Sequence, residues 1–305
     1  MNEQKFTFPI REVKTTGILR TPDDVQGALP TIVIMHPISS VKEQTSSIYA
    51  KRLTEDGFAT FVFDASHQGE LHEAPEYIEV PYYRVNDVKW AIDFLNTLDV
   101  VDNDRIGIAG ICGGGGYAVN AALTEKRIKA VASLTGANYG MLTREGDMSP
   151  QSALDSLHMV AKQREAEAMG AEAAFTQYSP NSHEERKHAG TEDIDIIQAV
   201  DYYEEHAPHP NRTNRYHVTD IGEVAGWDAT HLADELLDQS LIIFAGKIPG
   251  TFGAYRTAYE LYDKALTTDK QLKILPQTTH YDIYDKPETV DTIMKDLTPF
   301  FQEKL

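Results

Sequence analysis

The 305-residue sequence predicts an α/β protein with a mostly parallel, doubly wound sheet and a helical insertion. Short apolar runs rich in β-branched residues recur without polar alternation, which is typical of strands buried on both faces of a parallel sheet. Helical segments separate these runs, so strand and helix alternate as right-handed crossovers require. Between residues 139 and 236 the alternation stops, and the chain becomes polar and helical.

Residues 5–20 alternate apolar and polar side chains around Gly17, which predicts a β-hairpin or two edge strands. Strands are then expected at residues 31–35, 59–65, 105–111, 128–134, 241–245 and 272–275, and helices at 43–56, 85–98, 254–265 and 290–301. We therefore expect a core domain of residues 1–138 and 237–305, interrupted by a cap of residues 139–236. Within the cap, Ser149 followed by Pro150 is typical of a helix start.

The formal net charge of −19 argues against nucleic acids and anionic membranes as partners, because both demand basic surface. With a single cysteine the chain cannot form an intramolecular disulfide. The first residues lack the apolar stretch of a signal peptide, and no segment is long enough to span a membrane. We expect a cytoplasmic protein. A homodimer is possible.

A nucleophile elbow is expected where the strand at 105–111 meets a small-residue helix pattern. The sequence there is Gly110-Ile111-Cys112-Gly113-Gly114, a G-x-C-x-G motif. A nucleophile on such a sharp turn needs a strained backbone, and side chains two residues away would collide with it. The helix N-terminus would favour the thiolate of Cys112. The alternative is a packing turn or a phosphate cradle, although the Lys-Ser/Thr of a P-loop is missing.

His280 follows the last expected strand, in the sequence Gln277-Thr278-Thr279-His280-Tyr281-Asp282. A nucleophile in mid-chain and a histidine after the last strand match the order of α/β-hydrolase triads. Two other groups have structural interpretations. We expect His36 to be a hydrogen-bonded core residue and Asp64 to order its loop.

The sequence resembles α/β hydrolases of the dienelactone hydrolase type. The resemblance covers residues 31–137 and 240–305 and is carried by the segments MHPISS, FDASHQGE, GICGGGGYA and TTHYDIYD. It is strongest for a bacterial subgroup with cysteine at the elbow and a helical insertion. It implies Cys112 as nucleophile, His280 as general base, and an oxyanion hole formed by the N–H groups of Ile38 and Gly113. It implies cleavage of esters, lactones or thioesters. We expect no cofactor.

The acid of the triad departs from the family pattern. It normally follows the strand that ends here at Ala245, but residues 246–253 contain no carboxylate. Glu145 or Asp147 could supply a displaced acid, and Asp282 could bend back towards His280. A Cys112–His280 dyad is the third possibility, because a thiolate needs less help than an alkoxide. Loss of catalysis is the fourth.

These residues leave several functions open. The first is hydrolysis of a small-molecule acyl substrate through an acyl-Cys112 intermediate, and an acyltransferase would use the same intermediate. A non-catalytic ligand-binding protein could have inherited the fold, and a lone cysteine could sense oxidants. The insertion is interpreted as a cap over the site, or as a solvated decoration or dimer contact. Its histidines match no metal-binding spacing, so we expect no metal (His183, His188, His206, His209).

Overall fold

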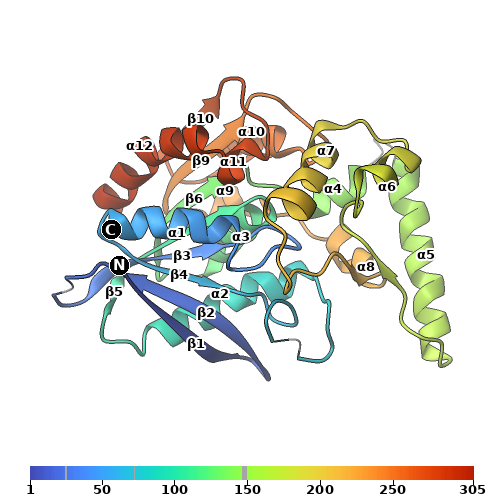
Figure 1. Ribbon diagram of the computed structural model, residues 1–305, viewed down its shortest axis with the longest axis horizontal. Helices are drawn as coiled ribbons and strands as arrows, with labels where there is room; N and C mark the ends of the chain where they lie inside the picture. Colours follow the sequence, from blue (N-terminus) through green and yellow to red (C-terminus); the bar gives the residue numbers. More distant parts are fainter. Residues whose placement is uncertain (25, 72, 146–149) are drawn as a thin grey trace.

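The computed structural model describes residues 1–24, 26–71, 73–145 and 150–305. Its centre is an eight-stranded sheet (Figure 1) with the order β1-β2-β4-β3-β5-β6-β9-β10. The strands are β1 (Asn2–Ile10), β2 (Val13–Thr21), β3 (Leu29–Met35), β4 (Ala59–Phe63), β5 (Val101–Ile111), β6 (Ile128–Leu134), β9 (Ser240–Gly246) and β10 (Lys270–Leu275). This order confirms the predicted α/β architecture.

The sheet is antiparallel at one edge and parallel elsewhere. β2 pairs antiparallel with both β1 and β4, which confirms the hairpin expected at the start of the chain. From β4 to β10 every neighbouring pair is parallel. The carboxyl ends of the parallel strands therefore lie along one edge, where loops after several strands can converge on a site.

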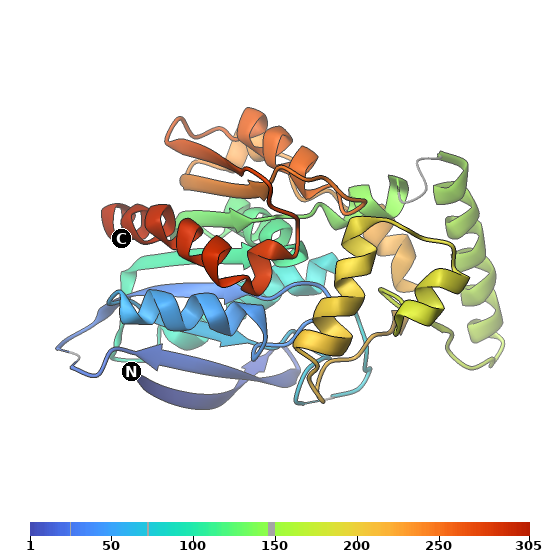
Figure 2. The same cartoon turned by 45° about the horizontal axis from the view of Figure 1, so that its top comes forward.

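Helices cover both faces of the sheet (Figure 2). On one face lie α1 (Thr45–Glu55) and α12 (Pro287–Lys304), and on the other lie α2 (Pro81–Leu95), α3 (Gly113–Thr124) and α10 (Ala254–Lys264). Each face has its own apolar core. In β3, Ile32 and Ile34 pack into one core, while Val33 and Met35 pack into the other. The uninterrupted apolar sequence of the strand follows from this double burial.

Residues 139–236 leave the sheet after β6 and return to it at β9. They form α4 (Tyr139–Glu145), α5 (Pro150–Ala168), β7 (Phe175–Thr176), α6 (His183–His188), α7 (Ile194–Val200), the π-helix η1 (Asp201–His206), β8 (Tyr216–His217), α8 (Asp220–Ala225) and α9 (Ala233–Leu236). The segment is helical as expected, but it also contains a short antiparallel ribbon of β7 and β8. Figure 1 shows most of it beside the core, with α5 on the outer side.

Among the boundaries that differ from the sequence prediction are those of β4, α2 and α5. β4 ends at Phe63, because the following residues turn into a polar loop. α2 begins at Pro81, where the fixed φ of proline at the first turn favours helix, rather than at Val85. α5 ends at Ala168, two residues before Gly170, although the helical pattern continues to residue 174. Ser149, its expected cap, lies outside the described residues.

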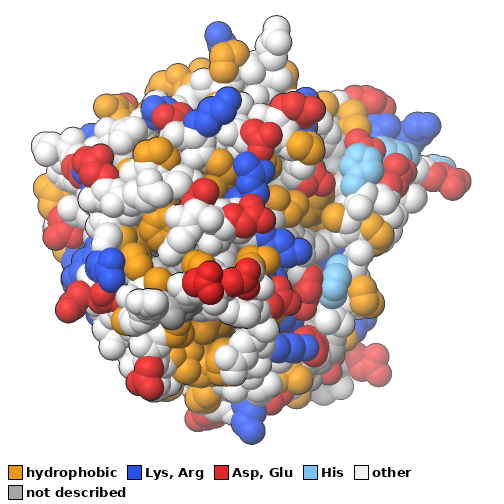
Figure 3. Space-filling view, turned by 60° about the vertical axis from the view of Figure 1, so that its left-hand side comes forward, with side chains coloured by type: hydrophobic (Ala, Val, Ile, Leu, Met, Phe, Trp, Pro, Cys, Tyr) orange, Lys and Arg blue, Asp and Glu red, His pale blue; other side chains and the backbone are white. Residues whose placement is uncertain are grey.

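The face shown in Figure 3 has acidic and basic side chains interspersed, without a broad basic patch. Among the helices of the described residues, none combines the length and apolarity needed to cross a membrane.

Candidate active site

Cys112 sits on the sharp turn between β5 and α3. Its backbone has φ 55° and ψ −127°, a strained conformation for a residue with a side chain. The two glycines of the motif make the turn possible. A Cβ on Gly110 would lie 2.1 Å from the carbonyl oxygen of Gly114, and one on Gly114 would lie 2.5 Å from that of Met35. The geometry is that of a nucleophile elbow.

The thiol of Cys112 is buried, and its side chain is 7% exposed. Burial raises its pKa to about 11, because the apolar surroundings disfavour the charged form. Interactions of the sulfur with the Tyr284 hydroxyl and the Gly113 N–H lower the pKa without overcoming burial. The helix N-terminus was expected to favour the thiolate, but burial outweighs this effect and keeps the thiol neutral near pH 7. The sulfur needs a base.

His280 lies at the same edge of the sheet, in the loop between β10 and α11 (Asp282–Asp285). Its Nδ1 is 2.8 Å from Oγ1 of Thr135, and its Nε2 is 3.3 Å from the Tyr284 hydroxyl. Burial lowers its pKa to about 3, so the imidazole is neutral near pH 7 and able to accept a proton.

Thr135 was missed by the sequence analysis. It follows β6 directly, and its φ of 44° is unusual for a β-branched residue. Its N–H donates to the carbonyl oxygen of Phe244 at 2.7 Å, which ties the turn to β9. Its position directly after a strand was visible in the sequence, but the triad pattern requires a carboxylate, which threonine does not have.

Of the three candidate acids, neither of the two that the structure describes is found at Nδ1 of His280. Glu145 is half exposed and pairs with Arg256. Asp282 accepts the N–H of Thr279 at 2.9 Å and pairs with Lys286 at 3.1 Å. Asp147 lies outside the described residues. Among the residues that the structure does describe, the hydroxyl of Thr135 occupies the acid's position.

A buried carboxylate does reach the loop where the family acid was expected, but it comes from α7. Asp195 accepts the N–H of Phe252 at 2.9 Å, and Asp193 accepts that of Thr251 at 3.2 Å. Gly250 leaves room for this contact, since a Cβ there would lie 2.2 Å from Cγ of Asp195. Burial raises the pKa of Asp195 to about 6. These contacts join residues 139–236 to the loop after β9.

Tyr284 connects the nucleophile and the base. It lies on α11, four residues after His280, and its hydroxyl hydrogen-bonds both to the sulfur of Cys112 and to Nε2 of His280. The spacing of four residues was visible in the sequence, but only the folded loop shows that the Tyr284 hydroxyl contacts both the sulfur and the imidazole.

The loop after β3 carries the other expected oxyanion donor. Ile38 packs against the elbow, because a Cβ on Gly113 would lie 2.4 Å from Cδ1 of Ile38. The next residue, Ser39, has φ 63°, so the loop turns sharply beside the sulfur. Tyr203 of η1 reaches this loop and donates to the carbonyl oxygen of Ile38 at 3.4 Å. The N–H groups of Ile38 and Gly113 thus belong to adjoining segments.

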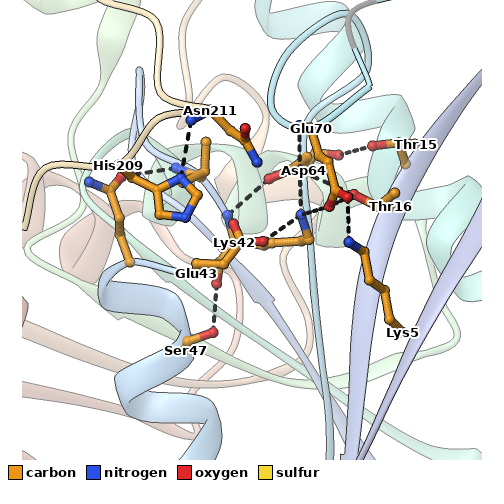
Figure 4. A network of polar contacts seen from close by, with 12 residues as sticks. Lys5, Thr15, Thr16, Lys42, Glu43, Ser47, Asp64, Glu70, His209 and Asn211 are labelled. Carbon is orange, nitrogen blue, oxygen red and sulfur yellow. Dashed lines mark hydrogen bonds and ion pairs between the residues drawn. The ribbon is translucent and has the colours of Figure 1, made fainter.

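A buried ion-pair network fixes the end of the same loop (Figure 4). Nζ of Lys42 is 2.7 Å from the carboxylate of Asp64 and 3.1 Å from that of Glu70. Asp64 also accepts the N–H groups of Lys42 at 3.0 Å and Glu70 at 3.1 Å. Asp64 therefore orders two loops at the site edge, as expected.

His36 has the structural role expected of it. Its Nδ1 lies 2.8 Å from the carbonyl oxygen of Pro37, and its Nε2 accepts the N–H of Ala65 at 3.2 Å. Burial and the neighbouring Arg84 guanidinium hold its pKa well below the usual range. The ring is neutral and fully engaged in the core.

A cavity of about 520 Å³ opens beside Cys112. Core residues form one side of it, including Ile38, Phe252 and Tyr284. The other side comes from residues 139–236. Its residues there are Tyr139, Leu142, Thr143, Ser156, Tyr178, Ser179, Pro180, Thr191, Asp193, Ile196, Ala199, Tyr203, Tyr216 and Ile221. The nucleophile therefore faces a pocket large enough for a small acyl group.

One group of side chains outside this cavity has metal-binding chemistry. His183, Asp201 and Glu205 bring ligand atoms within 4.8 Å of one another. Nε2 of His183 lies 2.8 Å from Asp201, so a hydrogen bond within the group already accounts for their approach. None of the three lines the cavity at Cys112.

The parallel sheet with its elbow, histidine and loop after β3 defines the fold as that of an α/β hydrolase. A family model described as "Dienelactone hydrolase family" matches residues 15–205. The chain belongs to this family, and it is an α/β hydrolase acting on ester-type bonds.

Individual relatives agree with this assignment. The uncharacterized protein YcjY of Escherichia coli (strain K12) is 36% identical over 280 residues, which cover 90% of this chain and 88% of the relative. Protein PA2218 of Pseudomonas aeruginosa is 32% identical over 292 residues, which cover 92% of this chain and 75% of the relative. In a structural comparison, the match to the crystal structure of PA2218 covers 100% of this chain and 94% of the PA2218 chain, with a TM-score of 0.89 and 27% identity.

A more distant structure shows the same fold. DcsB, solved in complex with a substrate analogue, has a TM-score of 0.82 at 17% identity and covers 99% of both chains.

Proposed function

We propose that the protein cleaves carboxylic esters, lactones or thioesters through a covalent acyl-Cys112 intermediate. The sulfur attacks the carbonyl carbon while its proton moves to Nε2 of His280. The N–H groups of Ile38 and Gly113 hold the oxyanion. When the C–O or C–S bond breaks, His280 returns the proton to the leaving group. Water then attacks the thioester with His280 again as base, which releases the acid and restores the thiol.

The observation that carries this proposal is the shared contact at the Tyr284 hydroxyl. Nδ1–H of His280 donates to Oγ1 of Thr135, which leaves a lone pair on Nε2. This lone pair accepts the hydroxyl hydrogen of Tyr284. The oxygen of the same hydroxyl can then accept the thiol hydrogen of Cys112. This arrangement gives the proton of Cys112 a continuous path to the neutral imidazole. A structural cysteine in an inert core requires neither the strained elbow nor such a path.

Residues 139–236 act in this proposal as a cap. They supply much of the cavity lining, and Tyr203 reaches the loop of Ile38 from this segment. Enclosure of the acyl-enzyme limits the access of water. Because Cys112 is only 7% exposed, the acyl-enzyme can also transfer its acyl group to a bound alcohol, amine or thiol instead of to water.

The test follows p-nitrophenol release from a short-chain p-nitrophenyl ester in the first turnover, together with the intact mass of the protein. We expect a burst and an acyl adduct in the wild type, and neither in Cys112→Ala. Slow decay of the adduct that accelerates with an added thiol or alcohol would indicate transfer. Identical behaviour of wild type and variant, without an adduct, would refute covalent catalysis.

A further inference from the structure

A second group of aromatic side chains lines the cavity, apart from those at Cys112. Tyr139 begins α4, Tyr178 lies between β7 and α6, and Tyr216 belongs to β8. The rings of Tyr178 and Tyr216 are stacked, with centroids 4.4 Å apart and planes at 23°. Aromatic surfaces of this kind favour a planar ring as ligand.

The hydroxyl of Tyr178 is buried and has no hydrogen-bond partner among the residues that the structure describes. The hydroxyl of the neighbouring Tyr216, in contrast, hydrogen-bonds to Tyr139. A buried hydroxyl without a partner costs free energy, and a polar group on a ligand would remove this cost. Tyr178, which lines the cavity, therefore offers a ligand a hydroxyl that no described residue uses, beside an aromatic wall.

The charges around the cavity disfavour an anionic ligand. Of the described residues that line it, Asp193 alone carries a formal charge, and it is negative. The buried guanidinium of Arg84 does not line the cavity, and both of its terminal nitrogens have partners. It pairs with the buried Glu79 at 3.1 Å and donates to the carbonyl oxygen of His36 at 3.1 Å. A carboxylate or phosphate on the acyl group would therefore meet no cation among the described lining residues.

From these observations we infer that the cavity selects an uncharged acyl group carrying an aromatic ring with a hydroxyl substituent. The ring packs against Tyr178 and Tyr216, and the substituent hydrogen-bonds to the Tyr178 hydroxyl. This inference rests on the proposed function for the identity of the bound group as the acyl part. The binding site itself is independent of any reaction at sulfur.

The experiment measures binding to the Cys112→Ala variant by calorimetry, so turnover plays no part. Three ketones without a leaving group serve as probes: 4-(4-hydroxyphenyl)butan-2-one, 4-phenylbutan-2-one and 4-(4-carboxyphenyl)butan-2-one. We expect the hydroxyphenyl compound to bind about fivefold more tightly than the phenyl compound, as for one hydrogen bond to a buried group. The carboxyphenyl compound should bind at least about tenfold more weakly than the hydroxyphenyl compound.

Adding Tyr178→Phe keeps the ring and removes the hydroxyl. The advantage of the hydroxyphenyl compound should then disappear, while the phenyl compound binds as before. Tyr82→Phe is the matched control, because Tyr82 is 66% exposed and does not line the cavity. The inference fails if none of the ketones binds, if the carboxylate binds as tightly as the hydroxyl compound, or if the advantage survives in Tyr178→Phe.

The same measurements separate this inference from the proposed function. Wild-type protein that forms no acyl adduct, while Cys112→Ala still shows the expected order of binding, would refute covalent catalysis and support the ring-binding cavity. An acyl adduct on Cys112, combined with equal binding of the three ketones, would support covalent catalysis and refute the ring-binding cavity.

Discussion

Oγ1 of Thr135 lies 2.8 Å from Nδ1 of His280, where an α/β hydrolase normally places a carboxylate. A hydroxyl can orient the imidazole and favour one tautomer, but it cannot stabilise the imidazolium by its charge. The arrangement suits a thiol nucleophile, which transfers its proton more easily than an alcohol.

Thr135→Val should lower kcat/KM for an ester substrate by about tenfold, because the imidazole loses the partner that fixes its tautomer. Thr135→Ser keeps the hydroxyl and should restore most of the activity, which a purely structural role of the methyl group would not allow. Thr292→Val, on the exposed side of α12, controls for the loss of a threonine. Equal activities of the Val and Ser variants would contradict the positioning role.

Tyr284→Phe should slow alkylation of Cys112 by iodoacetamide severalfold at pH 7. The variant removes both the hydroxyl that lowers the pKa of the thiol and the proton path to His280. The rate of carboxamidomethylation, followed by intact mass, measures this effect. The exposed Tyr82→Phe should react like the wild type. Faster alkylation in Tyr284→Phe would show that the hydroxyl shields the sulfur instead.

The pH dependence of acylation follows from the two buried groups. The pKa of Cys112 is raised to about 11 and that of His280 is lowered to about 3, so the neutral pair persists between these values. We expect the burst rate to change less than about threefold from pH 5 to pH 8, without a fall near the usual histidine pKa. In His280→Ala, thiolate alone would react, and the rate should rise about tenfold per pH unit. A wild-type profile falling below pH 6.5 would contradict the buried, neutral base.

Gly110→Ala should destabilise the fold by about 3 kcal/mol or more, since the new Cβ would meet the backbone of Gly114 at 2.1 Å. Backbone cannot move aside as a flexible side chain can. The control is Gly222→Ala in α8, where the nearest atom would be 3.4 Å away and helix propensity favours alanine by up to about 1 kcal/mol. Urea denaturation of both variants measures the difference. A stable Gly110→Ala protein would exclude the tight elbow.

Asp195→Asn should change the pH dependence of stability. The pKa of Asp195 is raised to about 6 in the folded protein, from an ordinary value of 3.8. Its protonation therefore stabilises the fold fully below the ordinary value, and this contribution is lost as pH rises through about 6. At pH 8 the variant should be more stable by about 2 kcal/mol, because it has no buried charge at position 195.

The gain in Asp195→Asn should shrink as the pH falls towards 4. Urea denaturation at pH 4, 6 and 8 gives the profile, with the exposed Asp263→Asn as control. A variant less stable than the wild type at pH 8 would mean that the charge on Asp195 is needed to hold the loop of Phe252.

Local sequence determined the strands, the elbow and the general base candidate. Burial on both faces leaves uninterrupted apolar runs, and the turn at Cys112 demands glycines at fixed spacing, so residues close in the chain carry these signals. The resemblance to dienelactone hydrolases added the order of nucleophile and base. The partition into core and cap and the cytoplasmic location stay predictions.

Tertiary structure decided the rest of the site. Thr135, Tyr284 and Asp195 come from three separate segments, and only the sheet edge brings them to Cys112, His280 and the loop of Phe252. Protonation also depends on folding: a helix N-terminus favours a thiolate, but burial of Cys112 outweighs it and keeps the thiol neutral. Short-range sequence specifies backbone turns, whereas the partners and solvation that set a group's chemistry depend on residues far apart in the chain.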